Sequence, residues 1–354
     1  CQRTYLVTGY VAWSIQWIVS DPMTNNKSEL GERPLVNVED LTVIFEARGN
    51  IVHALDTVTL SINAGERIGI VGESGSGKST LALALGGHIQ GAGRRSGGSV
   101  DVVATDVFTA SPEALGRLRR GHLGYIFQNP IGTLDPTRKV SRQFFGTDGR
   151  PISEARIANV LEQVRLDDIP RVLKSYPHEL SGGMAQRVAI AMAIEHEPRL
   201  IIADEPTSAL DASVRLQILD LLKEISIRSG AALIIVSHDL KAVRSYCERV
   251  AVMYAGRIVE LGDSKDVFAE PSHPYTAALI RAMPGEEGID GEIRGIRGNP
   301  PLVTKRLEAC AFAERCDYVL DECWHLRTEP TLQNNRWVSC HLASRGISAR
   351  AAEG

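Results

Sequence analysis

Hydrophobic and polar residues alternate along two early stretches of the chain. Residues 35–45 and residues 51–62 share this two-residue period, which is typical of strands with one buried face. Gly49 and Asn50 lie between them and favour a tight hairpin turn. The pattern therefore predicts a small antiparallel sheet. A further strand is predicted at 99–103, after a glycine-rich linkage.

Uninterrupted apolar runs replace this alternation further along the chain. Residues 68–71, 200–203 and 232–236 are short aliphatic runs, as expected for parallel strands that are buried on both faces. A shorter run at 124–127 is a further strand. Residues 249–261 contain a turn at Gly256 and predict a closing hairpin, and beyond Asp263 the periodic α/β pattern stops.

Helical periodicity lies between these strands. Residues 131–180 lack strand signals, so we expect a helical insertion there. Its clearest helical spacing of i, i+3, i+4 and i+7 joins four apolar residues: Ile157, Val160, Leu161 and Val164. A second apolar stripe at 214–225 predicts the helix that connects two buried strands.

A glycine-rich segment follows the run at 68–71 and leads into a stretch with helical character. It has the form G-x-x-x-x-G-K-S, the phosphate-binding P-loop. Glycines let the backbone curl so that successive N–H groups point at phosphate oxygens, and the helix N-terminus adds partial positive charge. The lysine reaches the β- and γ-phosphates, and the serine hydroxyl is offered to Mg²⁺. The predicted phosphate-binding residues are Gly72, Glu73, Ser74, Gly75, Ser76, Gly77, Lys78, Ser79 and Thr80.

Polar side chains stand where the apolar runs end. Asp204 and Glu205 follow the run at 200–203. Two carboxylates at the end of a buried strand are costly as structure, but they fit a site that holds a metal and a phosphate. Gln128 and His238 end two other strands. A lone histidine is usually structural, but here one site can collect all four residues.

Composition narrows the class of protein. The chain has 354 residues, 44% hydrophobic and 23% charged, which predicts a globular protein of about two domains. Its formal net charge is −4 without a strongly basic block, so nucleic-acid binding through bulk charge is not indicated. No apolar run is long enough to span a bilayer.

The N-terminal stretch fits neither a membrane span nor a signal peptide. Residues 5–19 are apolar and aromatic but are interrupted by polar residues, and Arg3 alone precedes them. We expect residues 1–34 to be an extension that is disordered or not native. Met23 is expected to be the true start, with residues 1–22 as upstream read-through.

The motifs in this order resemble the ATP-binding subunits of ABC transporters over residues 36–262. The P-loop corresponds to the Walker A motif, and Asp204 and Glu205 end the Walker B motif. Gln128 corresponds to the Q-loop and His238 to the switch histidine. The roles implied by this resemblance are phosphate binding by Lys78, Mg²⁺ ligation by Ser79 and Gln128, support of the metal's water shell by Asp204, general-base catalysis by Glu205 and γ-phosphate contact by His238.

Two further segments resemble motifs of the same family. Residues 180–186 resemble the signature and residues 208–211 the D-loop. The resemblance implies that the signature completes the ATP site of a partner subunit, so that ATP is held between two chains. The signature residues expected to do so are Ser181, Gly182, Gly183 and Gln186.

The sequence around the motifs resembles that of the oligopeptide, dipeptide and nickel importer ATPases in particular. The segments that carry this likeness are 127–130, 176–180, 252–256 and the His-Pro-Tyr segment 271–279. Two departures stand out: the stretch 128–180 is shorter than is usual, and no tyrosine stands where the family often stacks adenine. Phe45 is the nearby aromatic residue, and a strand core position explains it equally well.

Four cysteines gather near the C-terminus with the spacing C-x5-C-x6-C-x16-C: Cys310, Cys316, Cys323 and Cys340. Disulfides are not expected in a cytoplasmic ATPase, and the short C-x2–4-C pairs favoured by zinc are absent. Four thiolates suit a [4Fe–4S] cluster, and the importer resemblance implies one. Zn²⁺ and unmetallated thiols are the alternatives. Cys247 is predicted to pack within a helix.

The resemblance implies an ATPase that uses ATP and Mg²⁺ to energise a peptide-type importer. Its expected partners are a second ABC ATPase subunit (a paralogue or a second copy), two membrane permease subunits and, indirectly, an extracytoplasmic substrate-binding protein, with no nucleic acid. It would lie at the cytoplasmic face of the cell membrane. The alternatives are a soluble ABC ATPase of translation or DNA repair and a scaffold with an inactive site; the absence of a second cassette and the intact motifs disfavour them.

The expected architecture is α/β. We expect a P-loop NTPase core with an antiparallel β subdomain over residues 35–262, including a helical subdomain at about 131–186. A small cysteine-containing C-terminal extension of the oligopeptide-transporter type is expected over residues 263–354.

Overall fold

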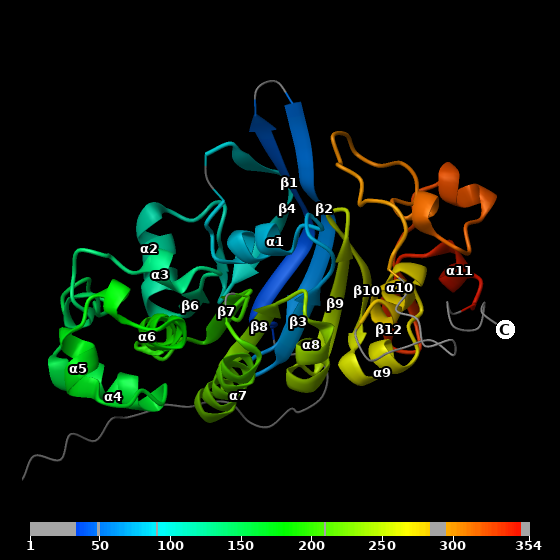
Figure 1. Ribbon diagram of the computed structural model, residues 1–354. Coiled ribbons are helices and arrows are strands. Elements are labelled where there is room, and N and C mark those ends of the chain that lie inside the picture. Colours follow the sequence, from blue (N-terminus) through cyan, green and yellow to red (C-terminus); the bar gives the residue numbers. More distant parts are fainter. Residues whose placement is uncertain (1–32, 48–49, 90, 209, 284–294, 348–354) are drawn as a thin grey trace, which may run out of the picture. The chain divides into compact units, whose positions relative to one another are not determined.

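The computed structural model describes residues 33–47, 50–89, 91–208, 210–283 and 295–347 (Figure 1). The predictions for residues 1–32 and for a turn at Gly49 lie outside the described residues. Among the described helices, none is both long enough and apolar enough to cross a bilayer.

The predicted antiparallel sheet is present and has four strands. Their order is β2 (Asn50–Ile62), β1 (Val36–Ala47), β4 (Gly93–Val102) and β5 (Thr105–Asp106). The prediction for the third strand was wrong at its start. β4 begins in the glycine-rich stretch because that stretch pairs with β1, with Gly93 opposite Phe45 and Gly97 opposite Thr42.

A second, mixed sheet of eight strands forms the centre of the fold. Its order is β11 (Thr331–Gln333), β12 (Arg336–Val338), β10 (Arg257–Asp263), β9 (Arg249–Tyr254), β3 (Arg67–Val71), β8 (Ala232–Val236), β7 (Leu200–Asp204) and β6 (Leu123–Ile126). The strands from β9 to β6 run parallel, and the β9–β10 hairpin is antiparallel, as predicted. The carboxyl ends of the parallel strands therefore meet at one edge of the sheet.

Successive residues of the parallel strands enter two different cores. Ile202 and Ile234 pack with the antiparallel sheet and with α1 (Lys78–Leu85). Their neighbours Ile201 and Ile235 pack with α7 (Ala212–Ser229) and α8 (Leu240–Tyr246). The sheet is thus covered on both faces, which explains why these strands are uninterrupted aliphatic runs.

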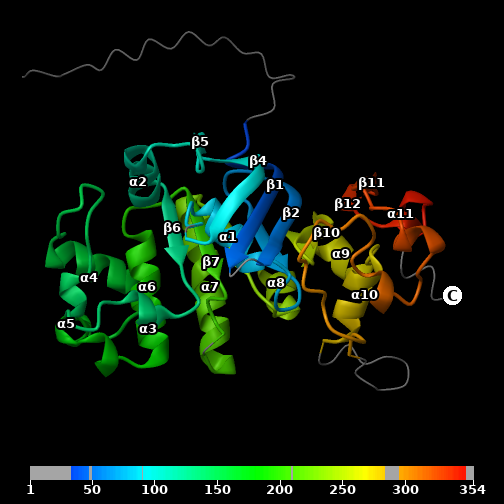
Figure 2. The same ribbon diagram turned by 90° about the horizontal axis from the view of Figure 1, so that it is seen from above.

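The β6 edge of the sheet carries the predicted helical insertion. Figures 1 and 2 show these helices together, away from the C-terminal part. They are α3 (Pro130–Thr133), α4 (Glu154–Gln163), α5 (Ile169–Lys174) and α6 (Gly182–Ile194), while α2 (Pro112–Gly121) precedes β6. Ser153 and Ser181 cap α4 and α6 by accepting backbone N–H bonds.

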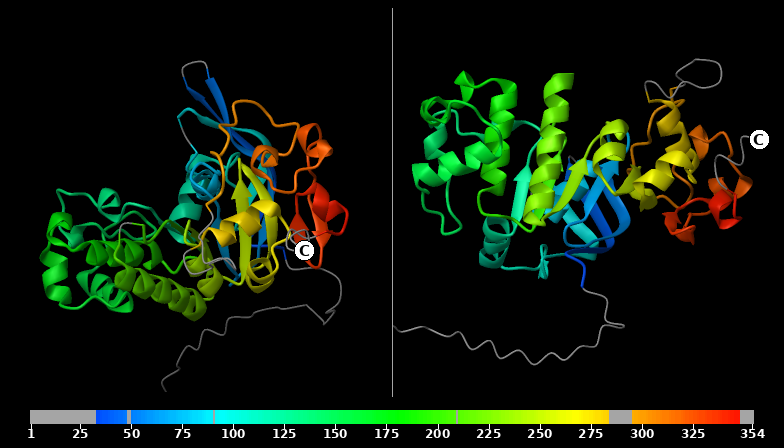
Figure 3. Two further views of the ribbon diagram at one scale, coloured as in Figure 1. Left: turned by 45° about the vertical axis from the view of Figure 1, so that its right-hand side comes forward. Right: turned by 90° about the horizontal axis from the view of Figure 1, so that it is seen from below.

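The opposite edge of the sheet is built by the C-terminal extension. It contains α9 (Ser264–Ala269), α10 (Pro274–Arg281), the β11–β12 hairpin and α11 (His341–Ser344), which lie together in Figure 3. The α/β pattern does stop at Asp263, but the sheet does not, because β12 pairs with β10 through Glu260 and Val338. Arg327 also forms an ion pair of 2.9 Å with the buried Asp56 of β2.

Gly69 sets the distance between the central sheet and α8. It is buried in the middle of β3, and a Cβ atom there would overlap the side chain of Val243. We expect Gly69→Ala to lower the free energy of unfolding by about 1–3 kcal/mol, because the overpacked helix must shift. Urea unfolding of the full chain measures this.

Combining Gly69→Ala with Val243→Ala removes the methyl groups that the new Cβ atom would overlap. We therefore expect the double variant to lose less stability than the sum of the two single variants. Strictly additive losses would contradict the close packing of α8 on β3.

Candidate functional site

The P-loop connects β3 to α1 and closes tightly on neighbouring strands. Gly72 and Gly77 have φ angles of +151° and +101°, which only glycine adopts without strain. A Cβ atom at Gly77 would also lie 2.6 Å from the carbonyl oxygen of Ala54 in β2. The two glycines therefore give the loop its curl, as the motif predicts.

Lys78 lies over the loop at the first turn of α1. Its Nζ donates to the carbonyl oxygens of Gly72 and Glu73, both at 2.9 Å. Burial lowers the pKa of Lys78, and the negative charges of Glu205, Asp204 and Glu73 oppose that shift. The ammonium group is thus held by weak main-chain acceptors, which phosphate oxygens can replace.

Ser79 and Asp204 form a pair of oxygen donors at the end of β7. The Ser79 hydroxyl donates to Asp204 Oδ1 at 3.1 Å. Burial raises the pKa of Asp204, and the adjacent charge of Glu205 raises it further, whereas Ser79 and Lys78 lower it. A divalent cation would favour the ionised form of this carboxylate, and such oxygen donors fit Mg²⁺.

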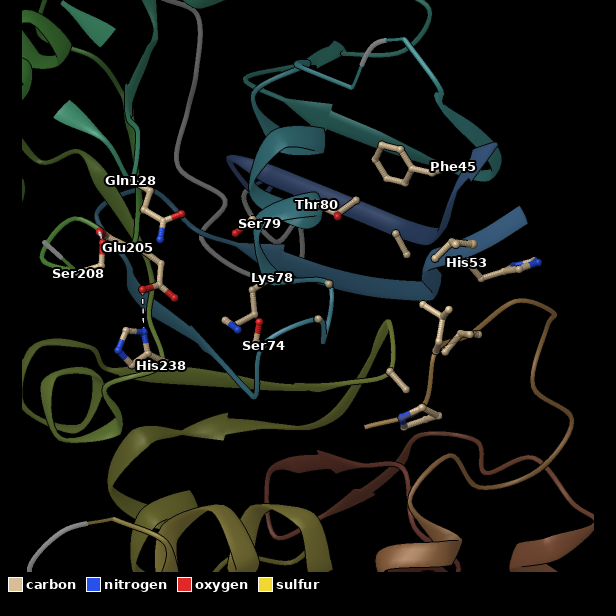
Figure 4. A pocket seen from close by; sticks show the side chains of 18 residues that line it. Phe45, His53, Ser74, Lys78, Ser79, Thr80, Gln128, Glu205, Ser208 and His238 are labelled. Carbon is tan, nitrogen blue, oxygen red and sulfur yellow. Dashed lines mark hydrogen bonds and ion pairs between the residues drawn. The ribbon is translucent and has the colours of Figure 1, made fainter. Parts of the chain in front are cut away.

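Glu205 and His238 join the ends of β7 and β8. His238 Nδ1 lies 2.7 Å from Glu205 Oε2, as the dashed line in Figure 4 shows. The Glu205 backbone has a φ of +50°, in the left-handed region that side chains rarely adopt, and its N–H donates to Val236. The backbone at Glu205 is therefore strained, and this strained conformation holds the Glu205 carboxylate at the end of β7.

One cavity of about 620 Å³ brings most of these groups together, but four of the predicted residues do not line it: Gly72, Glu73, Ser76 and Asp204. Figure 4 shows Glu205, His238 and Gln128 across the cavity from Lys78 and Ser79, with Ser208 beside Glu205. Ala209 of the predicted D-loop lies outside the described residues. The predicted residues that line the cavity are Ser74, Gly75, Gly77, Lys78, Ser79, Thr80, Gln128, Glu205 and His238.

The far end of the cavity is lined by residues that the motifs do not identify. Phe45 and His53 of the antiparallel sheet lie there, together with residues 301–303 of the C-terminal extension. The His53 N–H donates to the Val303 carbonyl at 2.8 Å, which fixes this segment against β2. Residues 301–303 carry no motif, and they approach the cavity only through tertiary packing.

The signature residues do not line this cavity. Ser181 and Gly182 are exposed at the start of α6, and Gly183 is half-buried. Gln186 differs from them because it is 1% exposed, and its Nε2 has no partner among the described residues. The structure therefore does not place Gln186 on a surface that another chain could touch, contrary to its grouping with the other signature residues.

The four C-terminal cysteines share one neighbourhood. Burial raises the pKa of the Cys316 thiol, the nearby thiols of Cys310, Cys340 and Cys323 raise it further, and the result is a pKa of about 12. The Cys310 backbone N–H also donates to the Cys323 carbonyl at 3.0 Å. However, among the described residues no group of three or more His, Cys, Asp or Glu side chains is arranged to hold a metal ion. The metal site thus has no support from this arrangement. Cys247 is buried but lies just after α8, not within it.

Comparisons with known proteins agree with the geometry. Residues 55–208 match the family described as ABC transporter, and residues 259–323 match the C-terminal region of oligopeptide/dipeptide transporters. The oligopeptide transport ATP-binding protein OppD of Escherichia coli is 40% identical over 82% of this chain and 87% of its own length. The dipeptide transport ATP-binding protein DppD of Haemophilus influenzae is 40% identical over 87% and 95%.

Solved structures show the same fold. A dimeric ATP-binding cassette bound to ADP and Pi is similar with a TM-score of 0.58 and 29% identity, covering 65% of this chain and 98% of its own. A cassette from Clostridium perfringens that is part of an ABC transporter complex has a TM-score of 0.58 and 32% identity, covering 68% and 92%. The P-loop, the Glu205–His238 pair and these likenesses together show that the chain belongs to the ATP-binding subunits of ABC transporters of the oligopeptide and dipeptide type.

Proposed function

We propose that this chain hydrolyses MgATP in the described cavity to drive the import of a peptide or a related small solute. The observation that carries this proposal is the Glu205–His238 pair, which faces Lys78 and Ser79 across one cavity. Bound Mg²⁺ would neutralise phosphate charge as it develops. An inactive scaffold would have no use for a carboxylate held at this point by the strained backbone of Glu205.

Some of the proposed site residues bind MgATP, and others take part in its hydrolysis. Lys78 and the loop N–H groups would bind phosphate oxygens, and the residues that would hold Mg²⁺ are Ser79 and Gln128, with Asp204 supporting them. Glu205 accepts a proton from, or orients, the attacking water. His238 donates toward the γ-phosphate, and its contact with Glu205 keeps both side chains at the same place.

The base of the nucleotide lies at the far end of the cavity. Phe45 offers a ring face there, and Val303 approaches from the C-terminal extension. Phe45 also packs against Gly93, so it serves the sheet and the cavity together. Adenine contact by Phe45 is thus compatible with its place in the strand.

The ATP site is completed by a second subunit. Ser181 and Gly182 are exposed and lie outside this chain's own cavity, as expected if they bind ATP held by another chain. The dimeric cassette bound to ADP and Pi supports this arrangement. Binding then closes the dimer and hydrolysis opens it, which is the motion that a permease can use.

We infer that the remaining partners are two permease subunits and, indirectly, a substrate-binding protein on the other side of the membrane, with this chain at the cytoplasmic face. Support for a membrane transporter comes from the likeness to proteins named for oligopeptide and dipeptide transport. The matched C-terminal region disfavours a soluble ATPase of translation or repair.

Glu205→Gln tests the proposed chemistry. In the assembled transporter, we expect this variant to bind ATP normally and to lose ATP turnover by at least about a hundredfold, because the amide cannot accept the proton. Phosphate release and nucleotide titration measure the two quantities separately.

Glu224→Gln is the matched control, because Glu224 forms an ion pair with Arg165 outside the cavity. It should keep both ATP binding and turnover. Near-normal turnover in Glu205→Gln would remove Glu205 from the mechanism.

We further propose that the four-cysteine neighbourhood holds a [4Fe–4S] cluster, with Zn²⁺ as the alternative. Support comes from the shared neighbourhood and from backbone N–H groups that point at two sulfur atoms: Tyr318 to Cys316 at 3.4 Å and Leu320 to Cys323 at 3.5 Å. Such N–H···S bonds tune iron–sulfur clusters. In the structure itself the side chains are not arranged around a metal.

Metal analysis of chain purified without oxygen decides between these occupants. We expect about four iron and four sulfide per chain, lost on Cys316→Ser. The Cys247→Ser variant is the control, since Cys247 is buried elsewhere, and it should keep the iron. Colourless protein with one zinc per chain, or with no metal, would contradict the cluster.

A further inference from the structure

Every polar group of the P-loop residue Glu73 is engaged. Its N–H donates to the Tyr275 hydroxyl at 2.8 Å, and its carbonyl accepts from Lys78 at 2.9 Å. Its carboxylate meets the guanidinium of Arg315. Two of these three contacts come from the C-terminal extension, and Tyr275 belongs to the His-Pro-Tyr segment that marks it.

The ion pair has the geometry of a specific contact. Arg315 Nη1 lies 2.7 Å from Glu73 Oε2, and Nη2 lies 3.0 Å from Oε1, so each terminal nitrogen donates to one carboxylate oxygen. The Arg315 side chain is 5% exposed and that of Glu73 is 24% exposed. Such bidentate pairs are among the strongest hydrogen-bonded contacts because they fix orientation as well as distance.

The surroundings of Arg315 allow little freedom. Its Nε donates to the Arg297 carbonyl at 2.6 Å, and Nη1 also donates to the Tyr254 hydroxyl at 3.2 Å. The guanidinium lies over the rings of Tyr254 and Phe312, at 5.7 and 5.9 Å from their centres. The hydrogen bond to Glu73 raises the pKa of Arg315, so the group stays charged. The extension thus presents a rigid cation to the P-loop.

The position of this cation matters for phosphate binding. An unpaired Glu73 carboxylate would place a negative charge on the loop that must receive a triphosphate, and repulsion between them would weaken binding. Arg315 neutralises that charge, while Tyr275 fixes the backbone from the same side. The remaining loop residues are then free to direct their N–H groups at the ligand.

We propose that Arg315 and Tyr275 are positioning residues of the ATP site, through which the C-terminal extension holds Glu73 and keeps the P-loop competent to bind MgATP. The inference rests on the proposed nucleotide cavity. It assigns to the extension a part in nucleotide binding that acts through Glu73, from which Arg315 lies 242 residues away along the chain.

Equilibrium titration of the full-length chain with MgATP tests this. We expect Arg315→Gln to raise the Kd by about tenfold, because it leaves the carboxylate of the P-loop residue Glu73 unpaired, and its negative charge opposes triphosphate binding. Adding Glu73→Gln to Arg315→Gln removes that charge and should recover most of the affinity. Arg315→Lys keeps the charge but not the two-pronged contact, and its Kd should fall between those of the wild type and Arg315→Gln.

Arg327→Gln is the matched control. It removes a different ion pair between the extension and the core, that with Asp56, and neither of these two residues lines the cavity or contacts Glu73 through its side chain. Its Kd for MgATP should equal that of the wild type. Equal weakening by Arg327→Gln and Arg315→Gln would overturn the inference, because docking of the extension would then explain both. A double variant as weak as Arg315→Gln would overturn it as well.

Tyr275→Phe keeps the ring in its core and removes the hydroxyl, so it tests the inference even if Arg315→Gln does not fold. We expect a rise in Kd of about threefold, and unchanged Kd values in both Tyr275→Phe and Arg315→Lys would refute the inference. Lys78→Ala separates it from the proposed function: MgATP binding that survives Lys78→Ala refutes the cavity itself.

Discussion

The conformation of the P-loop depends on contacts from both sides. On one side, Gly77 lets the loop pass close to Ala54 of β2. On the other, Arg315 and Tyr275 hold Glu73. A loop made largely of glycine and serine has high conformational entropy, so its binding geometry must come from such neighbours. The phosphate cradle is therefore a product of the antiparallel sheet, the parallel core and the C-terminal extension together.

The proposed catalytic groups follow from a simpler constraint. Parallel strands bring their carboxyl ends to one edge of the sheet, so Glu205 after β7 and His238 after β8 become neighbours. The strand pattern and the motifs predicted this grouping from the sequence because both are local in the chain. The helical insertion and the closing hairpin were predicted for the same reason, since each carries its own periodicity.

The contacts made by the extension were not predicted, and the reason is physical. Arg315 has no local pattern that distinguishes it from any other surface arginine, and its burial depends on Tyr254, which lies 61 residues before it along the chain, as well as on the nearby Phe312. Residues 301–303 reach the cavity through one backbone bond to His53. β12 likewise continues the sheet beyond the point where the sequence pattern ends. Tertiary packing decides all three: the short β11–β12 hairpin is marginal by itself, and the edge of β10 stabilises it.

Hydrogen–deuterium exchange of the P-loop amides tests the central claim, that the extension holds the loop, most directly. The Glu73 N–H is bonded to the buried Tyr275 hydroxyl and should exchange slowly in the full chain without nucleotide. The account predicts faster exchange across residues 72–80 in Arg315→Gln and Tyr275→Phe, with unchanged exchange in β8. Unchanged exchange of residues 72–80 in both variants would contradict it.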